Sequence, residues 1–454
     1  MRNKSLLISV SFILASATVA SGQSLLDLQG LFGRQQQDRV QDNAVKVEYD
    51  IDFQYFFDLR SFGASGDIFM ASQTFNVARF SPAAMLRFDQ DRQTTHRLAL
   101  GVDLTKNLGV NPTSEAIYSD SEHEARLTNI DLVKDIFFYY NYRKGFGDGL
   151  LDFYAGIHPR TVLEGDYTRA IFADDLRYYD PNLEGLTFKY AAPRFKAEVT
   201  ADIAGIRGID RVSSEMLFTA GAFKPVDWIS LGWSAIYAHS EGSILARADV
   251  DFALVNPYVK FDFGPKAGID ELSLKAGPLA SYQLDFKMPV INEEGESVGD
   301  SPHFPMGVEA VFNVRHSGFG FENTFYFGDN QQVYSSNAYA STAAATYSST
   351  LYTGETFYFT RRGYPSWYDR MELYWQPLNS GFVNARFSAV GHFVTVAGKD
   401  TDDPIGPFIG SQIKATLLFN LDAFRHPRES VSSDRGRRAR STQRSEPAGP
   451  VLSL

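Results

Sequence analysis

The hydrophobic pattern of this chain has a period of two over long stretches. In residues 45–58 every odd position is apolar or aromatic, and six of the seven even positions are polar. Side chains of a β-strand point alternately to opposite faces, so this stretch predicts a strand with one apolar face and one charged face. It is much longer than the usual strand of about 5–6 residues.

Sixteen strand-like runs follow one another, and no amphipathic helical segment of twelve residues interrupts them. In the run at 248–263 the alternation changes phase at Pro257, which predicts a bulge or a bend there. We predict strands near residues 44–57, 73–88, 94–104, 131–143, 149–158, 184–192, 194–204, 213–224, 227–239, 248–263, 269–286, 305–316, 318–328, 365–378, 381–396 and 406–424.

Long and short connections alternate along these runs. Segments such as 105–130, 159–183 and 329–364 are long, whereas the turns at Pro193 and Ser317 are very short. An up-and-down transmembrane barrel has tight turns at one end and longer loops at the other, and a soluble sandwich has no reason for this order. We therefore predict an all-β fold, a transmembrane antiparallel up-and-down β-barrel of about 16 strands, with fourteen or eighteen as alternatives. Lipid would contact the apolar faces, and water inside the barrel would contact the charged ones.

The ends of the chain differ from this body. Residues 1–22 have the basic start, apolar middle and small residues of a secretory signal peptide. We expect residues 23–43 to be a leader or a plug and residues 44–424 to be the barrel. Residues 425–454 form an Arg-rich tail that we expect to be disordered. After residue 22 no run reaches the roughly 18 apolar residues of a spanning helix.

Composition narrows the chemistry. The 454 residues include no Cys, which excludes disulfides and thiolate sites. The formal net charge is −11, and residues 23–424 carry −17, because residues 1–22 carry +2 and residues 425–454 carry +4. This argues against a nucleic-acid partner. The histidines show no zinc-binding spacing and the acidic clusters show no EF-hand spacing, so we expect no metal and no cofactor.

The chain is similar to Gram-negative outer-membrane porins in its signal peptide, lack of Cys, acidic body and aromatic alternating strands. The segments YYDPNLEGLTFKY and PSWYDRMELYWQPL also resemble uncharacterised porin-like barrels of Bacteroidota. The resemblance implies an outer-membrane location, contact with lipid and lipopolysaccharide, and passage of small hydrophilic solutes. It is compatible with a homotrimer. Such barrels usually end on an aromatic residue, whereas thirty residues follow Phe424 here.

Charged side chains on the inward faces would line a water-filled lumen, or would simply pair across strands. The pore-lining candidates are Glu48, Asp50, Asp52, Arg97, Asp103, Lys196, Glu198, Asp202, Glu309, Arg315, Arg370, Glu372 and Arg386. The loop at 159–183 would either narrow the pore or lie outside in solvent. Its charged candidates for a constriction are Arg160, Arg169, Asp174, Asp175 and Arg177. The loop at 329–364 is a second candidate for an inward position.

The sequence thus favours a porin for passive diffusion of small hydrophilic solutes. Two alternatives stay open: a structural or secretion-linked barrel with an occluded lumen, and a substrate-specific channel for a sugar or an anion. His158, His239 and His392 could serve an enzyme at the barrel rim, but no motif joins them to a nucleophile, and we expect no enzyme.

Overall fold

The computed structural model describes residues 45–62, 72, 74–91, 93–108, 135–174, 176, 181–204, 213–241, 249–285, 302, 304–329, 331, 354–355, 358, 366–380, 382–396 and 408–420. The chain divides into two units, Met1–Ala44 and Val45–Leu454, and the second unit contains all the described residues. The predicted signal peptide (1–22), leader (23–43) and tail (425–454) lie outside the described residues.

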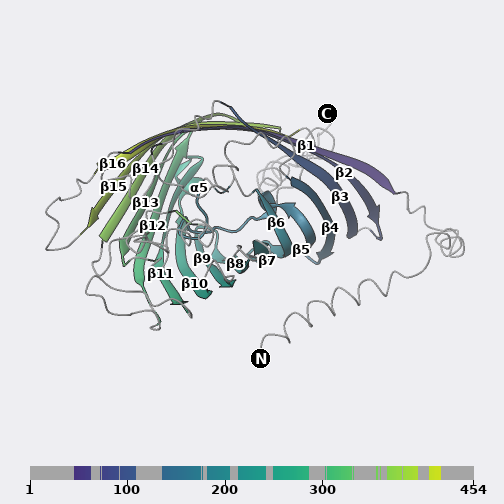
Figure 1. Ribbon diagram of the computed structural model, residues 1–454, viewed down its shortest axis with the longest axis horizontal. Helices are drawn as coiled ribbons and strands as arrows, with labels where there is room; N and C mark the ends of the chain where they lie inside the picture. Colours follow the sequence, from purple (N-terminus) through teal and green to yellow (C-terminus); the bar gives the residue numbers. More distant parts are fainter. Residues whose placement is uncertain are drawn as a thin grey trace, which may run out of the picture. The chain divides into compact units, whose positions relative to one another are not determined.

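Sixteen antiparallel strands form a closed barrel in the described part of Val45–Leu454 (Figure 1). They are β1 (Lys46–Phe62), β2 (Thr74–Asp89), β3 (Thr94–Asn107), β4 (Asp135–Phe146), β5 (Gly149–Pro159), β6 (Asn182–Ala192), β7 (Phe195–Ala204), β8 (Ser213–Val226), β9 (Ile229–Glu241), β10 (Asp249–Asp262), β11 (Glu271–Asp285), β12 (Met306–His316), β13 (Phe319–Gly328), β14 (Ser366–Asn379), β15 (Val383–Val396) and β16 (Phe408–Asn420).

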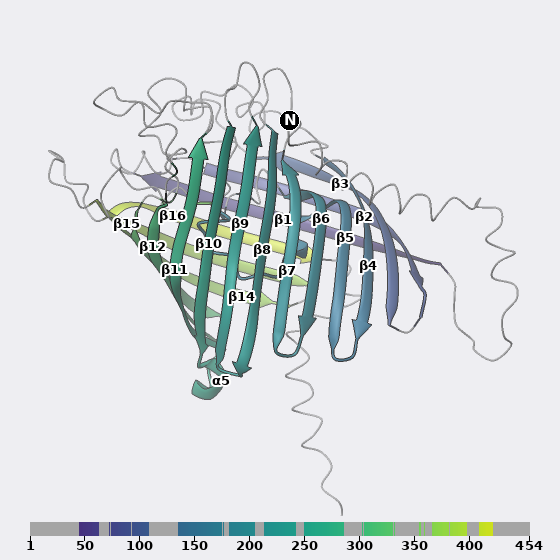
Figure 2. The same ribbon diagram turned by 90° about the horizontal axis from the view of Figure 1, so that it is seen from below.

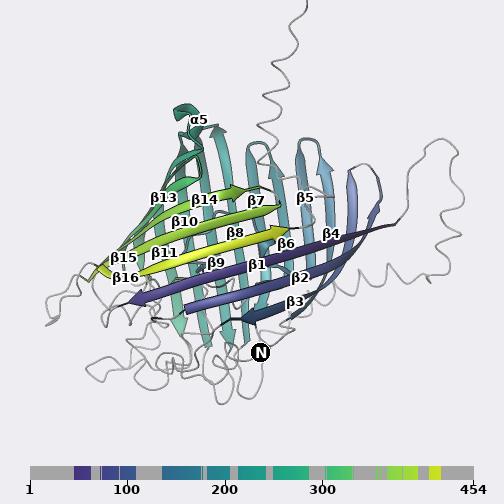
Figure 3. The same ribbon diagram turned by 90° about the horizontal axis from the view of Figure 1, so that it is seen from above.

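The barrel closes where the first strand meets the last. β1 pairs with β16 from Asp52 opposite Asn420 to Phe62 opposite Gly410. Figure 3 shows β1 (purple) running beside β16 (yellow). Closure leaves no sheet edge with unpaired backbone groups, which a strand in hydrocarbon could not tolerate. The predicted antiparallel fold and the number of strands are therefore confirmed.

The two ends of the barrel differ. Tight hairpins and the short helix α5 (Gly264–Ala267) lie together at one end, here called the turn end (Figure 2). At Ser317 and Gly318 the backbone has φ values of 51° and 83°, which suit a two-residue hairpin turn. The opposite end is called the loop end, because the longer connections start and finish there. None of the helices in the described residues is long and apolar enough to span a bilayer.

The inner and outer faces follow the predicted alternation in β1. Val47 is 75% exposed on the outside, whereas Glu48, Asp58 and Arg60 point inward and are at most 5% exposed. Other strands repeat this pattern, as Leu100 shows with 56% exposure. An outer wall of exposed apolar side chains around a polar inner wall is the arrangement of barrels that stand in lipid.

The bulge predicted at Pro257 does not form, although the ladder between β10 and β11 is interrupted there: Val255 pairs with Ala280 and Val259 with Ala276, and residues 256–258 are not part of the pairing. β10 pairs with β9 without a register shift from Asp249 to Phe261. The sequence pattern changes phase because Phe252 and Leu254 are apolar although they point inward, where they are at most 7% exposed. Their partners lie inside the barrel, so an apolar residue in this strand does not mark the lipid-facing side.

An interior apolar cluster fills part of the barrel. Its strand members lie towards the loop end, and the described part of the chain thus has a packed region where the charge pattern predicted water. The members are Phe62, Ala170, Ile171, Leu183, Met216, Phe218, Ile236, Ala238, Phe252, Leu254, Leu279, Tyr326, Tyr358, Tyr368, Val394 and Ile409.

Candidate functional site

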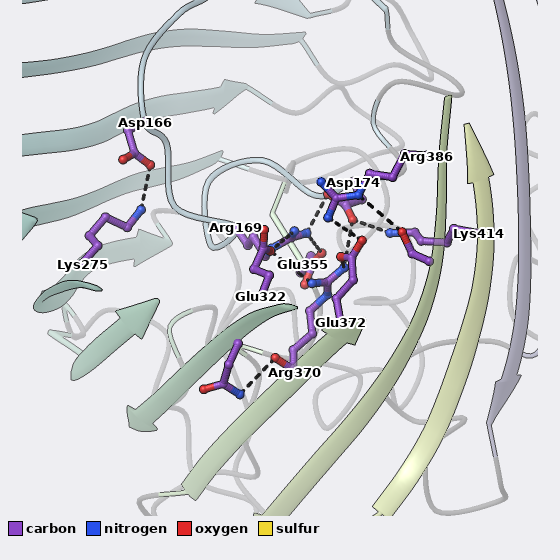
Figure 4. Close-up of polar contacts among 12 residues, drawn as sticks. Asp166, Arg169, Asp174, Lys275, Glu322, Glu355, Arg370, Glu372, Arg386 and Lys414 are labelled. Carbon is purple, nitrogen blue, oxygen red and sulfur yellow. Dashed lines mark hydrogen bonds and ion pairs between the residues drawn. The ribbon is translucent and has the colours of Figure 1, made fainter. Parts of the chain in front are cut away.

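The chain between β5 and β6 runs along the inside of the barrel. It begins with the short helix η1 (Arg160–Val162), and residues 160–174 are here called the inward segment. Their polar contacts reach the wall from β6 round to β16. Figure 4 shows part of this path, from Asp166 beside Lys275 to Asp174 beside Lys414.

Hydrogen bonds to β6 and β7 hold the start of the inward segment. The backbone N–H groups of Glu164 and Gly165 donate to the Glu198 carboxylate at 2.9 and 3.0 Å. Lys189 donates to the Glu164 carboxylate at 2.5 Å and to the Val162 carbonyl at 2.7 Å. The wall therefore recognises the backbone of the segment as well as its side chains.

Asp166 forms the next anchor. Its carboxylate lies 2.9 Å from the Lys275 Nζ and 3.5 Å from the Lys260 Nζ. Burial by itself would raise the pKa of Asp166, but Lys275 and Lys260 outweigh burial and lower this pKa to about 2. Asp166 is therefore ionised at neutral pH and ties the segment to β10 and β11.

Glu309 joins the inward segment to Tyr358. The Thr168 hydroxyl and the Tyr358 hydroxyl both donate to Glu309 Oε2 at 2.5 Å. Glu309 is 2% exposed, so both bonds are buried. Burial, together with the charge of Glu309, raises the pKa of Tyr358 well above its usual value, and its hydroxyl keeps the proton that it donates.

Eight charged side chains form an ion-pair network at the middle of the site (Figure 4). Four cations face four carboxylates, so the network neutralises itself. Its members are Arg169, Arg370, Arg386 and Lys414, with Asp174, Glu322, Glu355 and Glu372.

Arg169 contacts three of these carboxylates. Its guanidinium lies 2.6 Å from Asp174, 2.8 Å from Glu322 and 2.9 Å from Glu355. Burial would lower the pKa of Arg169, but these carboxylates reverse the effect and raise it well above the usual value. Asp174 belongs to the inward segment itself, so Arg169 joins two positions of the segment to each other. Through Glu322, Arg169 also attaches the segment to β13.

The wall supplies the other three cations. Arg370 is fully buried and lies 2.6 Å from Glu372, 3.3 Å from Glu322 and 3.4 Å from Asp174. Lys414 also pairs with Asp174, and Arg386 lies 2.7 Å from Glu372. The end of the inward segment is thus held against β13, β14 and β16.

The opposite side of the inward segment is apolar. Ala170 and Ile171 are at most 1% exposed within the interior apolar cluster. The ring of Phe172 meets Phe218 edge-on, with centroids 5.1 Å apart. Burial, with the nearby Glu198 carboxylate, raises the pKa of Tyr167 well above its usual value, so this ring stays neutral.

Parts of the second predicted inward loop also contact the interior. The Gln331 carbonyl accepts hydrogen bonds from Ser281 at 3.0 Å and Gln283 at 2.5 Å. The Glu355 N–H donates to the Arg169 carbonyl at 2.9 Å. The described residues of 329–364 therefore include a second set of contacts that support the inward segment.

A small polar pocket of about 20 Å³, enough for about one water molecule, lies on the side of β1, β2 and β4. Beside it Arg79 donates to both carboxylate oxygens of Asp103, at 2.9 and 2.6 Å, and Asn182 donates to the same carboxylate at 2.7 Å. Among the side chains that line the pocket are Asp50, Asp52, Arg79, Tyr139, Pro159 and Thr161. The start of the inward segment thus forms one wall of the pocket.

The thirteen predicted pore-lining side chains all lie on inward faces, but the structure divides them between different surroundings. Arg370, Glu372 and Arg386 belong to the ion-pair network, whereas Glu198 and Glu309 hold the inward segment. These five positions are anchors of a packed interior.

The remaining candidates contact one another, the inward segment or other residues of the wall. Asp50 and Asp52 accept hydrogen bonds from Asn420, at 3.3 and 2.5 Å. Glu48 pairs with Arg97 at 3.2 Å near the turn end.

Two further candidates meet the inward segment. Asp202 lies 3.5 Å from Arg160, and Lys196 donates to the Glu164 carbonyl at 3.1 Å. Arg315 lies next to Glu271 in the register of β12 with β11. Of the constriction candidates, Arg160, Arg169 and Asp174 lie in the inward segment, whereas Asp175 and Arg177 lie outside the described residues.

Sequence analysis missed several residues of the site. Arg79, Asp166, Glu355 and Tyr358 were not among the candidates, although each contacts a charged partner. Arg79 shares its alternation phase with Ser81, and this phase was the available signal for an inward position. The other three lie in loops, where alternation gives no such signal.

The three histidines considered for an enzyme lie on separate strands. The His158 ring contacts the Gly156 carbonyl and the Thr187 hydroxyl, both at 2.9 Å. The His239 ring lies 2.7 Å from Asp251, and His392 lies 3.1 Å from the Tyr368 hydroxyl. Within the described ranges, no three His, Asp or Glu side chains form a group that could hold a metal ion.

Comparison with known proteins leaves the family open. No family model matches the chain, and no curated protein matches it. Several solved outer-membrane barrels are similar to it in fold. A loop-deletion mutant of OmpT, an outer membrane protein of Vibrio cholerae, has 8% identity and a TM-score of 0.47, and the alignment covers 83% of this chain and 99% of that one.

Two porins align over similar lengths. OmpF of Salmonella typhi, solved in complex with daunomycin, has 11% identity and a TM-score of 0.41, with 84% of this chain and 98% of that chain covered. A mutant of Rh. blastica porin has 9% identity and a TM-score of 0.38, with 83% and 100% covered. At these identities the likeness concerns the barrel fold alone, and the resemblance to a Bacteroidota family is not confirmed.

Proposed function

We propose that this protein is an outer-membrane channel of a Gram-negative bacterium, through which small hydrophilic solutes diffuse passively. The inward segment sets the width of the path, and no reaction and no cofactor are involved. The observation that carries the proposal is the combination of an apolar outer wall with an inner wall that carries charged side chains, such as Asp58, Arg60 and Asp103. Lipid on one side and water on the other explain this division.

Planar bilayers test the channel directly. The purified protein, refolded in detergent and checked for a heat-modifiable band, should produce stepwise current increases in KCl. Liposomes that contain it should swell in small sugars or amino acids and more slowly in larger solutes, because the inward segment narrows the lumen. Stable, correctly folded protein that gives neither current steps nor swelling would contradict the proposal.

A second candidate is a structural or secretion-linked barrel with a blocked lumen. The interior apolar cluster favours it, because sixteen buried side chains pack across the barrel towards the loop end. The same two assays separate the candidates, since a blocked barrel stays silent in bilayers. Release of the inward segment by mutation should then create a conductance that the native protein lacks.

A further inference from the structure

The outer wall has a shallow groove across β13–β16, which lie side by side in the barrel (Figure 3). The groove has a volume of about 510 Å³. The side chains of its lining that point outward are all apolar, and the strand register places them in two neighbouring rows. They are Phe319, Leu373, Trp375, Phe387, Ala389, Ile413 and Ala415.

Stacked aromatic rings border the groove on the side of the turn end. Phe319 directly follows the hairpin turn at Ser317 and Gly318. Its ring stacks on Trp375 with centroids 6.2 Å apart, and Trp375 stacks on Phe387 with centroids 5.8 Å apart. Aromatic side chains on the outer wall of a barrel gather where hydrocarbon meets the polar head groups. The groove therefore opens just inside the hydrocarbon, in the leaflet at the turn end.

Two alanines form the floor of the groove. Ala389 on β15 lies opposite Leu373 of β14 and Ile413 of β16, whose side chains are 63% and 55% exposed. Ala415 lies opposite Phe387 and ends the row of rings. Large side chains thus stand around two small ones, and the described side chains leave the space above the alanines unfilled.

Hydrocarbon is the material that fits this space. An unfilled groove loses the dispersion contacts of its lining, and inside a membrane such packing replaces the hydrophobic effect as the force for association. A flexible acyl chain can follow the floor and contact the rings on one side and Leu373 and Ile413 on the other. Because the outward lining is apolar, the occupant needs no hydrogen-bonding group. A protein partner would have to supply a protruding apolar side chain, whereas acyl chains surround the wall at this level in any case.

From this geometry we propose that the groove binds one acyl chain of a phospholipid from the leaflet at the turn end, and holds it longer than the chains that merely surround the barrel. The tight turns of outer-membrane barrels lie on the periplasmic side, where the leaflet consists of phospholipid, so the ligand is a phospholipid and not lipopolysaccharide. This inference goes beyond the proposed channel, because the lipid occupies the groove whether or not the barrel conducts.

Native mass spectrometry tests whether the lipid is retained. The protein, refolded into vesicles of palmitoyl-oleoyl phosphatidylethanolamine and then dissolved in excess mild detergent, should keep one phospholipid per barrel. Fluorescence tests where that lipid lies, because Trp375 is part of the groove. In the W228F/W233F/W367F variant Trp375 is the remaining tryptophan of the chain, and a retained lipid that is brominated on its oleoyl chain should quench its fluorescence.

Two variants fill the groove independently of each other. A389F and A415F each place a ring above the floor, on neighbouring strands, and each should lower the retained phospholipid severalfold. The matched control is A84F, because Ala84 is exposed on the outer wall in β2 and lies outside the groove. This control should retain as much lipid as the wild type. A heat-modifiable band for each variant shows that the barrel has folded.

The other possible results each overturn the inference. Folded wild-type protein that retains no phospholipid has no such site, and retention that A389F and A415F leave unchanged, or that A84F lowers equally, places the lipid elsewhere. Retention of lipopolysaccharide in preference, when both lipids are offered, assigns the groove to the other leaflet. Paired barrels that A389F separates would identify a second copy of the chain as the occupant. None of these results concerns current through the barrel, so the channel function stands or falls separately.

Discussion

Replacing Arg169 by methionine removes the cation through which the inward segment holds three carboxylates at once. The side chain is 19% exposed and lies within 2.9 Å of Asp174, Glu322 and Glu355. Removing one partner of a buried ion pair costs about 3–5 kcal/mol, because the other charge is left uncompensated. Arg370 and Lys414 still contact Asp174, so the lower end of this range applies.

A cost of about 3 kcal/mol corresponds to a roughly 150-fold increase in the population in which the inward segment has left the wall. The strand ladder does not involve Arg169, so the barrel itself should remain folded. Single-channel recordings of R169M should therefore show additional states of higher conductance with frequent transitions. The melting temperature of the barrel should change little.

R143M is the matched control for this prediction. Arg143 also pairs with an inward carboxylate, that of Asp152 at 2.8 Å, but both residues belong to the wall and neither contacts the inward segment. R143M should keep the conductance states of the wild type. If R169M records are indistinguishable from those of the wild type, Arg169 does not hold the segment, and the ion-pair network has no part in setting the path.

Three other outcomes follow from the structure. Asp166 has a pKa of about 2 beside Lys275, below its ordinary value. The contribution of Asp166 to stability is therefore complete above about pH 4 and is lost as the pH falls towards 2. Channel records should become unstable in that range, and D166N should remove this pH dependence. Asn323 and Asp369 form a hydrogen-bonded pair on the outer wall, where hydrocarbon disfavours polar side chains. In urea titrations of the protein in vesicles, N323L/D369L should therefore raise the free energy of unfolding by roughly 2–3 kcal/mol. An unchanged or lower free energy would argue against lipid contact there. Leu100 is 56% exposed in the middle of β3, and L100R should lower the same free energy by about 2–4 kcal/mol, whereas a neutral effect would contradict a lipid-facing outer wall.

The barrel could be predicted from sequence because alternation is a local property. Val47 and Glu48 point to opposite sides whatever the rest of the chain does, and lipid outside and water inside select opposite chemistry for them. The alternation of long and short connections then fixed the up-and-down order. The apparent phase change of the alternation at Pro257 was misinterpreted because Phe252 and Leu254 face an apolar interior. Alternation cannot distinguish that interior from lipid.

The candidate site could be predicted only in part. Inward position followed from alternation, so Arg370 and Glu372 were recognised as interior residues. Asp174, a partner of Arg370, lies about two hundred residues away along the chain, and no local pattern gives such a pairing. Glu355 and Tyr358 were missed for the same reason, because their positions depend on contacts with Arg169 and Glu309.

The inward segment lies where it does because two forces act on different parts of it. Apolar inward side chains such as Phe218 and Leu254 would face water in an open lumen, and covering them with Ile171 and Phe172 gains about 25 cal/mol for each Å² of apolar surface removed from water. This gain has little directional preference, so it favours occupation of the lumen without fixing a position. The charged contacts of the segment supply the position, since each carboxylate or guanidinium is stable only beside its partner on the wall. At Asp50 the wall offers a carboxylate in place of an apolar surface, and the segment approaches this part of β1 with its polar start, at Thr161.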